Sequence, residues 1–283
     1  MLMEELGITC HVGHPATIRA AEPRRQKHDR RDAALLRDLL AEDRFPAIWQ
    51  PSSELRDLRA LLLHRHEWVR LRTRVRNTLQ GIALAHGIRR QSGLWNRKGQ
   101  ATLKALPLLP HAGDRRSALQ VLHQEVAQHI HDLDQRVSAL AQERSQACRL
   151  MTHPGVGPVT ALATDVFVGD PTRFRNGTAL ASYVGMIPSE YSSGPRQRLG
   201  RLTKQGNRFL RFLWCEAGLQ AARHEAVLRR FYRHKLQQKG VGKARVAVGR
   251  KLSIRLWILL RDQIDHAEFC RRPQSRRQRG EAL

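Results

Sequence analysis

The sequence predicts a mainly α-helical protein that opens with a short α/β segment. Apolar residues recur at every third or fourth position over two long central stretches, which is the period of an amphipathic helix. A run typical of a strand lies near the N-terminus. Towards the C-terminus, glycines and prolines separate shorter apolar stretches, which favours several helices joined by turns.

The N-terminal segment combines a strand with a helix. Residues 7–18 contain the run ITCHV followed by a Gly-His-Pro turn, a pattern that predicts a short strand and its end. From residue 28 to 41 the pattern changes to a helix with a leucine-rich stripe, and Pro46 prevents its continuation. Asp29 and Asp32 fall in the first turn of this helix.

Two long amphipathic helices are expected next. The first covers residues 55–87, where leucine, valine and isoleucine recur among arginines, and the second covers residues 116–149, which carry a heptad-like seam. The two helices either form an antiparallel hairpin through the polar, proline-containing stretch 90–114, or each pairs with another subunit. In both cases the region is interpreted as a scaffold.

A domain boundary is expected at His153. The segment HPGVGPVTALA places two glycines and two prolines directly ahead of an apolar helix. The tail from residue 271 is basic and polar, and is predicted to be disordered. Between the boundary and the tail, helices are expected over residues 159–167, 176–184, 207–224 and 243–264.

The charge of the chain indicates a polyanionic partner. Lys and Arg number 50 against 25 Asp and Glu, a formal charge of +25, and the excess runs along the whole chain. A ribosome-associated or chromatin-like protein that binds nucleic acid without chemistry shows the same composition. No apolar run reaches the length of a membrane span and no signal peptide is recognised, so a cytoplasmic protein without membrane association is expected.

Cysteines and histidines show no metal-site spacing. The four cysteines stand far apart without a CxxC pair, which favours reduced, mostly buried thiols. His64 and His66, like His129 and His131, are separated by one residue within helical patterns. Such pairs point to different sides of a helix, so solvent-facing side chains are expected rather than ligands.

Asp29 and Asp32 are the first candidates for chemistry. Three residues apart at a helix start, their carboxylates share one face and suit a hard divalent cation that activates water or stabilises a leaving oxygen in phosphoryl transfer. The alternative is that acidic residues simply favour helix N-termini, and spacing alone supports that interpretation. The neighbouring Lys27, Arg30 and Arg31 add weight to a metal-bound phosphate.

The segment HPGVGPVTA matches the hairpin of a helix-hairpin-helix element. In such an element Gly155 and Gly157 let backbone N–H groups approach a DNA phosphate at the N-terminus of the next helix. The alternative is a plain glycine-rich turn between helices. The Pro-Gly-hydrophobic-Gly-Pro order favours nucleic-acid contact, which would engage the DNA backbone without reading its sequence.

Residues 188–211 carry a serine pair and a basic, glycine-punctuated loop ahead of a helix. A serine among cations is suited to attack a phosphodiester, because the cations offset the charge that develops on phosphorus oxygens. A phosphate-binding loop whose hydroxyls only donate hydrogen bonds explains the pattern equally well. The cations assigned to nucleic-acid binding in this segment are Arg196, Arg198, Arg201, Lys204, Arg208 and Arg211.

Three motifs in order, KHDRRDA, HPGVGPVTA and SSGPRQRLGRLTKQGNRFLR, resemble the transposases of the insertion-sequence-110 family, also called DEDD transposases. The resemblance covers residues 7–269. It implies a RuvC-like, RNase H-type N-terminal domain, a coiled-coil region and a C-terminal helical transposase domain. On this chain these would be residues 1–50, 51–145 and 146–270, followed by the tail 271–283.

The resemblance also implies site residues, a cofactor and partners. Asp29 and Asp32 match the last two acids of an Asp-Glu-Asp-Asp site that holds Mg²⁺, and Ser193 matches the serine that is thought to form a covalent link to DNA, with Ser192 as the alternative. Family members are recombinases guided by a structured RNA. They assemble as dimers that pair into a tetramer, so DNA, a guide RNA and further copies of the chain are the implied partners.

The chain departs from the family pattern at its start. The family's first Asp and its Glu have no counterpart ahead of the strand expected at ITCHV, because Glu4 and Glu5 stand too close to Gly7. An N-terminally truncated chain is therefore expected, through a misassigned start codon or a decayed copy. Three hypotheses follow: a metal-dependent, serine-assisted DNA transposase; a catalytically dead copy that only binds DNA and oligomerises; and a resolvase-like nuclease without the serine.

Overall fold

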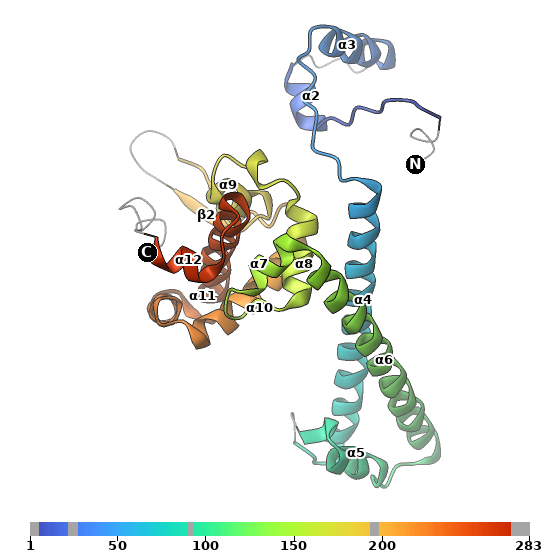
Figure 1. The fold of residues 1–283 in the computed structure, drawn as a ribbon. Coiled ribbons are helices and arrows are strands. Elements are labelled where there is room, and N and C mark those ends of the chain that lie inside the picture. Colours follow the sequence, from blue (N-terminus) through green and yellow to red (C-terminus); the bar gives the residue numbers. More distant parts are fainter. Residues whose placement is uncertain (1–5, 22–27, 90–92, 193–197, 273–283) are drawn as a thin grey trace. The chain divides into compact units, whose positions relative to one another are not determined.

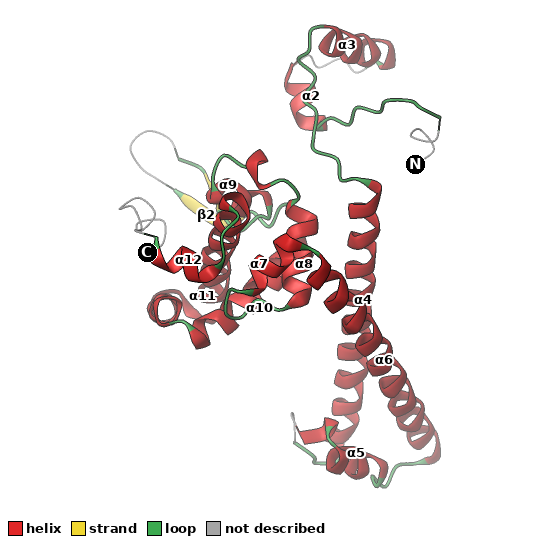
Figure 2. Cartoon of the chain, in the orientation of Figure 1, coloured by secondary structure: helices red, strands yellow, loops and turns green. Residues whose placement is uncertain are grey.

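The computed structural model describes residues 6–21, 28–89, 93–192 and 198–272. Helices dominate these residues, and the named strands within them form a single two-stranded antiparallel sheet (Figure 2). The mainly α fold predicted from the sequence is confirmed. The chain divides into two compact units, Met1–Asp57 and Leu58–Leu283. No helix within the described ranges is long and apolar enough to cross a membrane.

The first unit contains helices α2 (Pro15–Ala21) and α3 (Asp29–Ala41). The helix expected over residues 28–41 is thus confirmed, with His28 as its N-cap. The strand expected at ITCHV is wrong, because this run has no regular structure. The Ile48 N–H donates to the Val12 carbonyl, the Gln50 side chain donates to the Cys10 carbonyl, and the adjacent Gly13 forms an isolated bridge with Ala47. An extended run becomes a strand only where a neighbour pairs with it along its length.

Two long helices, α4 (Ser53–Ala85) and α6 (Pro110–Glu143), dominate the start of the second unit (Figure 1). Arg65 of α4 donates to Asp134 of α6 at 2.6 Å, Trp68 stacks on His129, and Arg76 donates to His123 at 2.9 Å. As the α4 residue number rises, its α6 partner's number falls. The antiparallel hairpin, one of the two arrangements expected from the sequence, is therefore the one observed.

The stretch between the two long helices is more ordered than its polar composition predicts. It contains the short 3-10 helix η1 (Gly93–Trp95) and helix α5 (Arg97–Lys104). Leu94 and Leu103 pack with Ala83 of α4 in a small core. The backbone comes so close there that a Cβ on Gly99 would lie 2.0 Å from the Gly93 carbonyl. Packing of Leu94 and Leu103 against Ala83 accounts for the position of this element.

The C-terminal part of the second unit is a compact helical bundle. Helices α10 (Arg208–His224) and α11 (Ala226–Asp262) approach closely, since a Cβ on Gly218 would lie 3.0 Å from the Gly249 Cα. Trp214 is fully buried and its indole N–H donates to the Thr164 hydroxyl at 2.9 Å. The elements are α7 (Ser145–Met151), α8 (Pro158–Val168), η2 (Pro171–Arg173), α9 (Gly177–Tyr183), β1 (Pro188–Glu190), β2 (Leu199–Leu202), α10 (Arg208–His224), α11 (Ala226–Asp262) and α12 (His266–Arg271).

Two boundaries in the second unit differ from expectation. The helix expected over residues 116–149 is divided at Arg144, which has an extended conformation and whose guanidinium contacts the buried Asp165 carboxylate at 2.5 Å. The helix expected from residue 243 begins already at Ala226, because α11 continues through a kink at Gly240, whose φ is +73°. Of the predicted disordered tail, residues 273–283 lie outside the described ranges.

The four cysteines are free thiols, as expected. Cys148 and Cys215 are half-buried, and burial raises the pKa of the Cys215 thiol to about 11. Cys10 and Cys270 are exposed, so the expectation of mostly buried thiols is wrong for this pair.

Candidate functional site

Asp29 and Asp32 lie exposed in the first turn of α3. The His28 ring caps this turn, because its Nδ1 accepts a hydrogen bond from the Arg30 N–H at 3.1 Å. The two carboxylates are accessible oxygen donors, the kind of ligand that Mg²⁺ prefers. Within the described residues neither belongs to a group of three or more metal-ligating side chains. The structure thus keeps both explanations of this acidic pair, a half-site for a cation and a favourable helix start.

The predicted serine loop is the connection of the β1–β2 hairpin. Pro188 pairs with Leu202 and Glu190 with Leu199, so the two strands close directly below the loop. The Ser192 hydroxyl donates to a Glu190 carboxylate oxygen at 2.7 Å and accepts from the Arg198 N–H at 3.0 Å. Through these two hydrogen bonds, Ser192 connects the two ends of the loop. Ser193 and Arg196 lie outside the described residues.

The hairpin is held against α9 by close backbone contacts. A Cβ on Gly206 would lie 1.9 Å from the Tyr183 carbonyl, and one on Gly185 would lie 2.2 Å from the Gln205 carbonyl. Both glycines have positive φ. Side chains larger than hydrogen are excluded at both positions, which sets where the loop emerges from the bundle.

The predicted cations around this hairpin divide into two groups. Arg211 is half-buried, and its guanidinium donates to the Val184 carbonyl at 2.6 Å and to the Gln205 carbonyl at 3.4 Å. Its side chain therefore holds the fold together. The remaining described cations are exposed on the hairpin, the following loop and the start of α10: Arg198, Arg201, Lys204 and Arg208.

The segment expected to form the hairpin of a helix-hairpin-helix element is the turn between α7 and α8. Gly155 has a φ of +88°, and a Cβ there would lie 2.4 Å from the backbone N of Ala221 in α10. Gly157 is the N-cap of α8, and a Cβ there would meet no described atom within 4 Å. Gly155 is thus required by internal packing, whereas Gly157 leaves open space at a helix N-terminus, where an anion is favoured.

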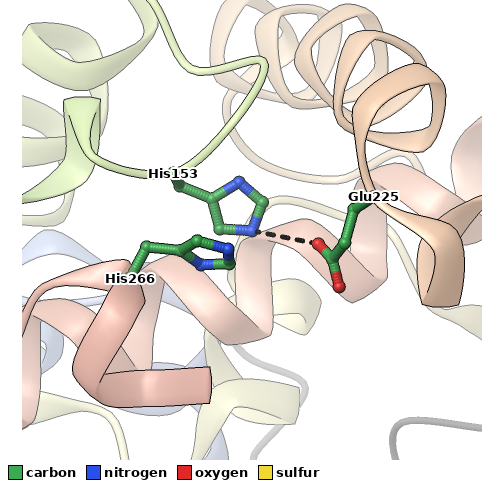
Figure 3. A group of neighbouring side chains, drawn as sticks. All are labelled: His153, Glu225 and His266. Atoms are coloured by element: carbon green, nitrogen blue, oxygen red, sulfur yellow. Dashed lines mark ion pairs between the residues drawn. The ribbon is translucent and has the colours of Figure 1, made fainter. Parts of the chain in front are cut away.

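His153, Glu225 and His266 form a cluster that spacing analysis missed (Figure 3). They come from the α7–α8 turn, the residue between α10 and α11, and the first residue of α12. One potential ligand atom from each lies within 4.8 Å of the others, and the His153 Nε2 lies 3.9 Å from a Glu225 carboxylate oxygen. The three residues are far apart in the sequence, so no local motif marks them.

Burial controls the protonation of this cluster. Burial, together with the neighbouring His266 and Arg255, lowers the pKa of His153 to about 4. Burial also lowers the pKa of His266. The Glu225 carboxylate accepts from the Arg255 guanidinium at 2.5 Å. Two neutral imidazoles therefore face an ion-paired carboxylate near neutral pH.

Two family models match different parts of the chain. A model of the DEDD transposase domain of the IS110 type, described as "Transposase", matches residues 1–86, which include Asp29 and Asp32. A model described as "Transposase IS116/IS110/IS902 family" matches residues 147–233, which include the α7–α8 turn and the serine hairpin. The two matched regions follow one another along the chain in the same order as the sequence motifs that they contain.

Individual relatives extend the similarity over most of the chain. A protein of Pseudomonas aeruginosa named "Probable family 20 transposase" is 26% identical over 96% of this chain and 81% of its own length. The "Transposase for insertion sequence element IS1111A" of Coxiella burnetii is 26% identical over 84% of the chain and 67% of its length. The transposase for IS1328 of Yersinia enterocolitica is 27% identical over 53% of the chain and 46% of its length.

Proposed function

The chain belongs to the IS116/IS110/IS902 family of transposases, and from that premise we propose that it cleaves and rejoins DNA strands in the transposition of an insertion sequence, using Ser193 and Mg²⁺. Family membership implies that the protein binds DNA, and its DEDD class implies a divalent metal. The serine step, the identity of the metal and guidance by RNA are the parts proposed.

The observation that carries the proposal is the β1–β2 hairpin. Its loop contains the serine pair, and exposed arginines lie at its base and on its second strand. Because the Ser192 hydroxyl is occupied by Glu190 and the Arg198 N–H, we assign the nucleophile to Ser193. Arg198 and Arg201 are suited to offset negative charge on a phosphate brought to this loop.

The proposed reaction has two successive steps, and each of them exchanges one phosphodiester bond for another. Ser193 Oγ attacks the DNA phosphorus, the new O–P bond forms as the bond to a deoxyribose oxygen breaks, the serine proton is released, and the leaving oxygen takes up a proton. In the second half a deoxyribose hydroxyl of another strand attacks the phosphoserine, and the serine regains its proton. No external energy source is required.

Asp29 and Asp32 fit the metal that this chemistry uses. Mg²⁺ is often bound by one or two carboxylates together with water and substrate phosphate, and both side chains are exposed oxygen donors. Bound there, the ion supplies stabilisation of charge on phosphate oxygens. The role of the two acids would be to hold the ion.

We further propose that DNA contacts the α7–α8 turn at Gly157 and the exposed cations near the hairpin, and that a structured RNA guides target choice. The chain is proposed to act as a dimer or tetramer. Large apolar side chains exposed on the long helices support contacts between copies: Leu63 and Leu84 on α4 and Val121 on α6. A cytoplasmic location stays a prediction from the sequence.

A second candidate is a protein that binds DNA and oligomerises without chemistry. It is favoured by one observation: among the described residues no third ligand joins Asp29 and Asp32. It predicts a salt-dependent complex with DNA in which no strand is cut, and which Asp29→Ala leaves unchanged. Metal-dependent strand cleavage would exclude it.

The test is a strand-transfer assay on plasmid DNA that carries the ends of the insertion sequence, with the full chain, RNA transcribed from the element and Mg²⁺. Ser193→Ala and Asp29→Ala are each expected to lower product at least about 100-fold, as the loss of a nucleophile or a metal ligand does. Asp38→Ala, in the same helix as Asp29, is the matched control for the metal ligand, and Ser192→Ala compares the two serines of the pair.

A protein–DNA adduct that survives denaturation and is absent in Ser193→Ala identifies the nucleophile. Loss of the adduct in Ser192→Ala alone would transfer the role to Ser192. Cleavage without any adduct would instead favour a resolvase-like nuclease, in which water attacks the phosphorus. Full activity in both Ser193→Ala and Asp29→Ala would overturn the assigned roles.

A further inference from the structure

His153, Glu225 and His266 join three segments at one point of the C-terminal bundle (Figure 3). His153 lies in the α7–α8 turn, Glu225 precedes α11, and His266 begins α12. Beside the cluster, the backbone N–H of His266 donates to the Thr152 hydroxyl at 2.9 Å, and this bond holds the start of α12 against the α7–α8 turn. The three side chains therefore stand on a supported framework.

The His153 ring is oriented as a ligand. Its Nδ1 lies 2.9 Å from the Pro154 carbonyl, and because a carbonyl oxygen only accepts, Nδ1 carries the proton. The Nε2 then has a free lone pair, is buried, and has no hydrogen-bond partner among the described residues. A backbone carbonyl that fixes one imidazole nitrogen while the other stays free is the usual arrangement at metal-binding histidines.

The His266 ring repeats this pattern. Its Nε2 lies 3.5 Å from the Cys270 thiol, and its Nδ1 is buried without a hydrogen-bond partner in the described part of the chain. Each of the two rings thus has one partnered nitrogen and one buried nitrogen without a partner. Buried polar atoms of this kind are uncommon in folded proteins and call for an explanation such as an ion.

Glu225 completes the donor set. One carboxylate oxygen lies 3.9 Å from the His153 Nε2 and accepts from the Arg255 guanidinium, so the carboxylate is held beside both rings. The Arg255 guanidinium opposes a cation here, and the negative charge of Glu225, with which it is paired, offsets it. Two imidazole nitrogens and one carboxylate oxygen are a donor set typical of Zn²⁺, whereas Mg²⁺ prefers oxygen ligands alone.

We propose that His153, Glu225 and His266 bind a Zn²⁺ ion that clamps the α7–α8 turn to the start of α11 and to α12. The ligand atoms lie within 4.8 Å of one another, and a tetrahedral zinc site would draw them to about 3.3 Å apart. Small side-chain shifts achieve this, with water as the fourth ligand. The site is separate from the acids Asp29 and Asp32, in both its residues and its choice of metal.

The test uses the full chain, stripped with a chelator and titrated with Zn²⁺ alone. One equivalent per chain by elemental analysis and a rise in Tm are expected, and millimolar Mg²⁺ should not reproduce them. His266→Gln, at a half-exposed position, should lose both effects, and Glu225→Gln should weaken binding by more than about 100-fold. His129→Gln, which changes an exposed histidine of α6, is the matched control.

Two further measurements separate this site from the proposed recombination chemistry. Asp29→Ala with Asp32→Ala should leave the zinc stoichiometry unchanged. Co²⁺ bound to the wild-type chain should show the visible absorption of a tetrahedral nitrogen and oxygen site, which keeps the test decisive if a histidine variant misfolds. Absence of stoichiometric zinc, or equal binding by His266→Gln, would overturn the proposal.

Discussion

At the scale of single residues, His123 makes the α4–α6 hairpin sensitive to acid. It is 8% exposed, its Nε2 accepts from the Arg76 guanidinium at 2.9 Å, and the Trp95 ring lies against it. Burial lowers its pKa below the ordinary 6.5, and Arg76 and Arg72 lower it further. A second proton would be placed on the nitrogen at which Arg76 already points.

His123 should therefore make the hairpin less stable as pH falls. The unfolded chain takes up a proton near pH 6.5 and the folded chain only at lower pH, so stability is lost as pH falls through 6.5 towards the folded pKa. His123→Gln removes this titration and keeps an acceptor for Arg76. Its Tm should decline less than that of the wild type between pH 7.5 and 5, as measured by circular dichroism.

His131→Gln, in an exposed position of the same helix, serves as the control and should follow the wild type. An unchanged pH dependence in His123→Gln would contradict the assigned role. The comparison is between variants because other buried histidines titrate in the same direction.

The candidate site residues were recognisable from the sequence only where a local motif carries them. Gly155 and Gly157 stand in one short segment, and the structure separates them by what surrounds each Cα. The cluster of His153, Glu225 and His266 has no such signal, because folding alone brings these residues together. Metal-ligand spacing in a sequence finds sites built on one turn or one helix, and this cluster uses three separate segments.

At the scale of elements, the α7–α8 turn shows how packing and binding use neighbouring glycines differently. Gly155 needs its positive φ and faces the backbone of α10, whereas Gly157 has an ordinary φ of −92° and open space beside it. The consequences of adding one methyl group should therefore differ in kind between the two positions.

Gly155→Ala should lower the free energy of unfolding by about 2–5 kcal/mol, since it adds backbone strain and a clash with Ala221. Gly157→Ala should cost under about 1 kcal/mol, as expected for a cap substitution. Urea denaturation measures both. If DNA phosphate approaches Gly157, its alanine variant should bind DNA about tenfold more weakly, the equivalent of one lost hydrogen bond to a charged group.

Equal destabilisation by the two substitutions would contradict this distinction. Unchanged DNA affinity in a folded Gly157→Ala protein would remove this turn from the DNA interface.

Among the elements, those with strong helical periodicity were predicted from the sequence and those made by packing were not. The stripe of α3 and the apolar repeats of α4 and α6 are local signals, so their existence was predictable. Helix α5 owes its position to a small core around Leu94 and Leu103. The first half of α11 was missed because it is polar and ends at Gly240, a residue that usually interrupts a helix.

At the scale of the whole molecule, the charge of +25 governs the encounter with nucleic acid. Part of that charge serves the fold instead: Arg65, Arg144 and Arg255 are paired with acids at their helix contacts. The exposed arginines near the serine hairpin are the ones expected to meet phosphates. Net charge alone predicts a polyanionic partner. Only the structure distinguishes the arginines that are paired with acids from those that are exposed near the serine hairpin.

Arg201→Gln and Arg208→Gln should each reduce the salt dependence of DNA binding. The slope of log Kobs against log salt concentration should fall by about 0.9 for each DNA phosphate that the variant no longer neutralises. Fluorescence anisotropy over a range of salt concentrations measures it. Arg136→Gln, an exposed arginine of α6, is the control, and an equal effect there would mean that net charge rather than this surface sets the slope.

The antiparallel pairing of α4 and α6 also has a consequence for the order in which the chain folds. The sequence separation of paired residues falls from 69 for Arg65 and Asp134 to 47 for Arg76 and His123, and is 20 for Gln120 of α6 and Gln100 of the intervening helix α5. Closing a short loop loses less chain entropy than closing a long one. Contacts near α5 therefore form at the lowest entropic cost, and the hairpin is expected to zip from that end towards the bundle.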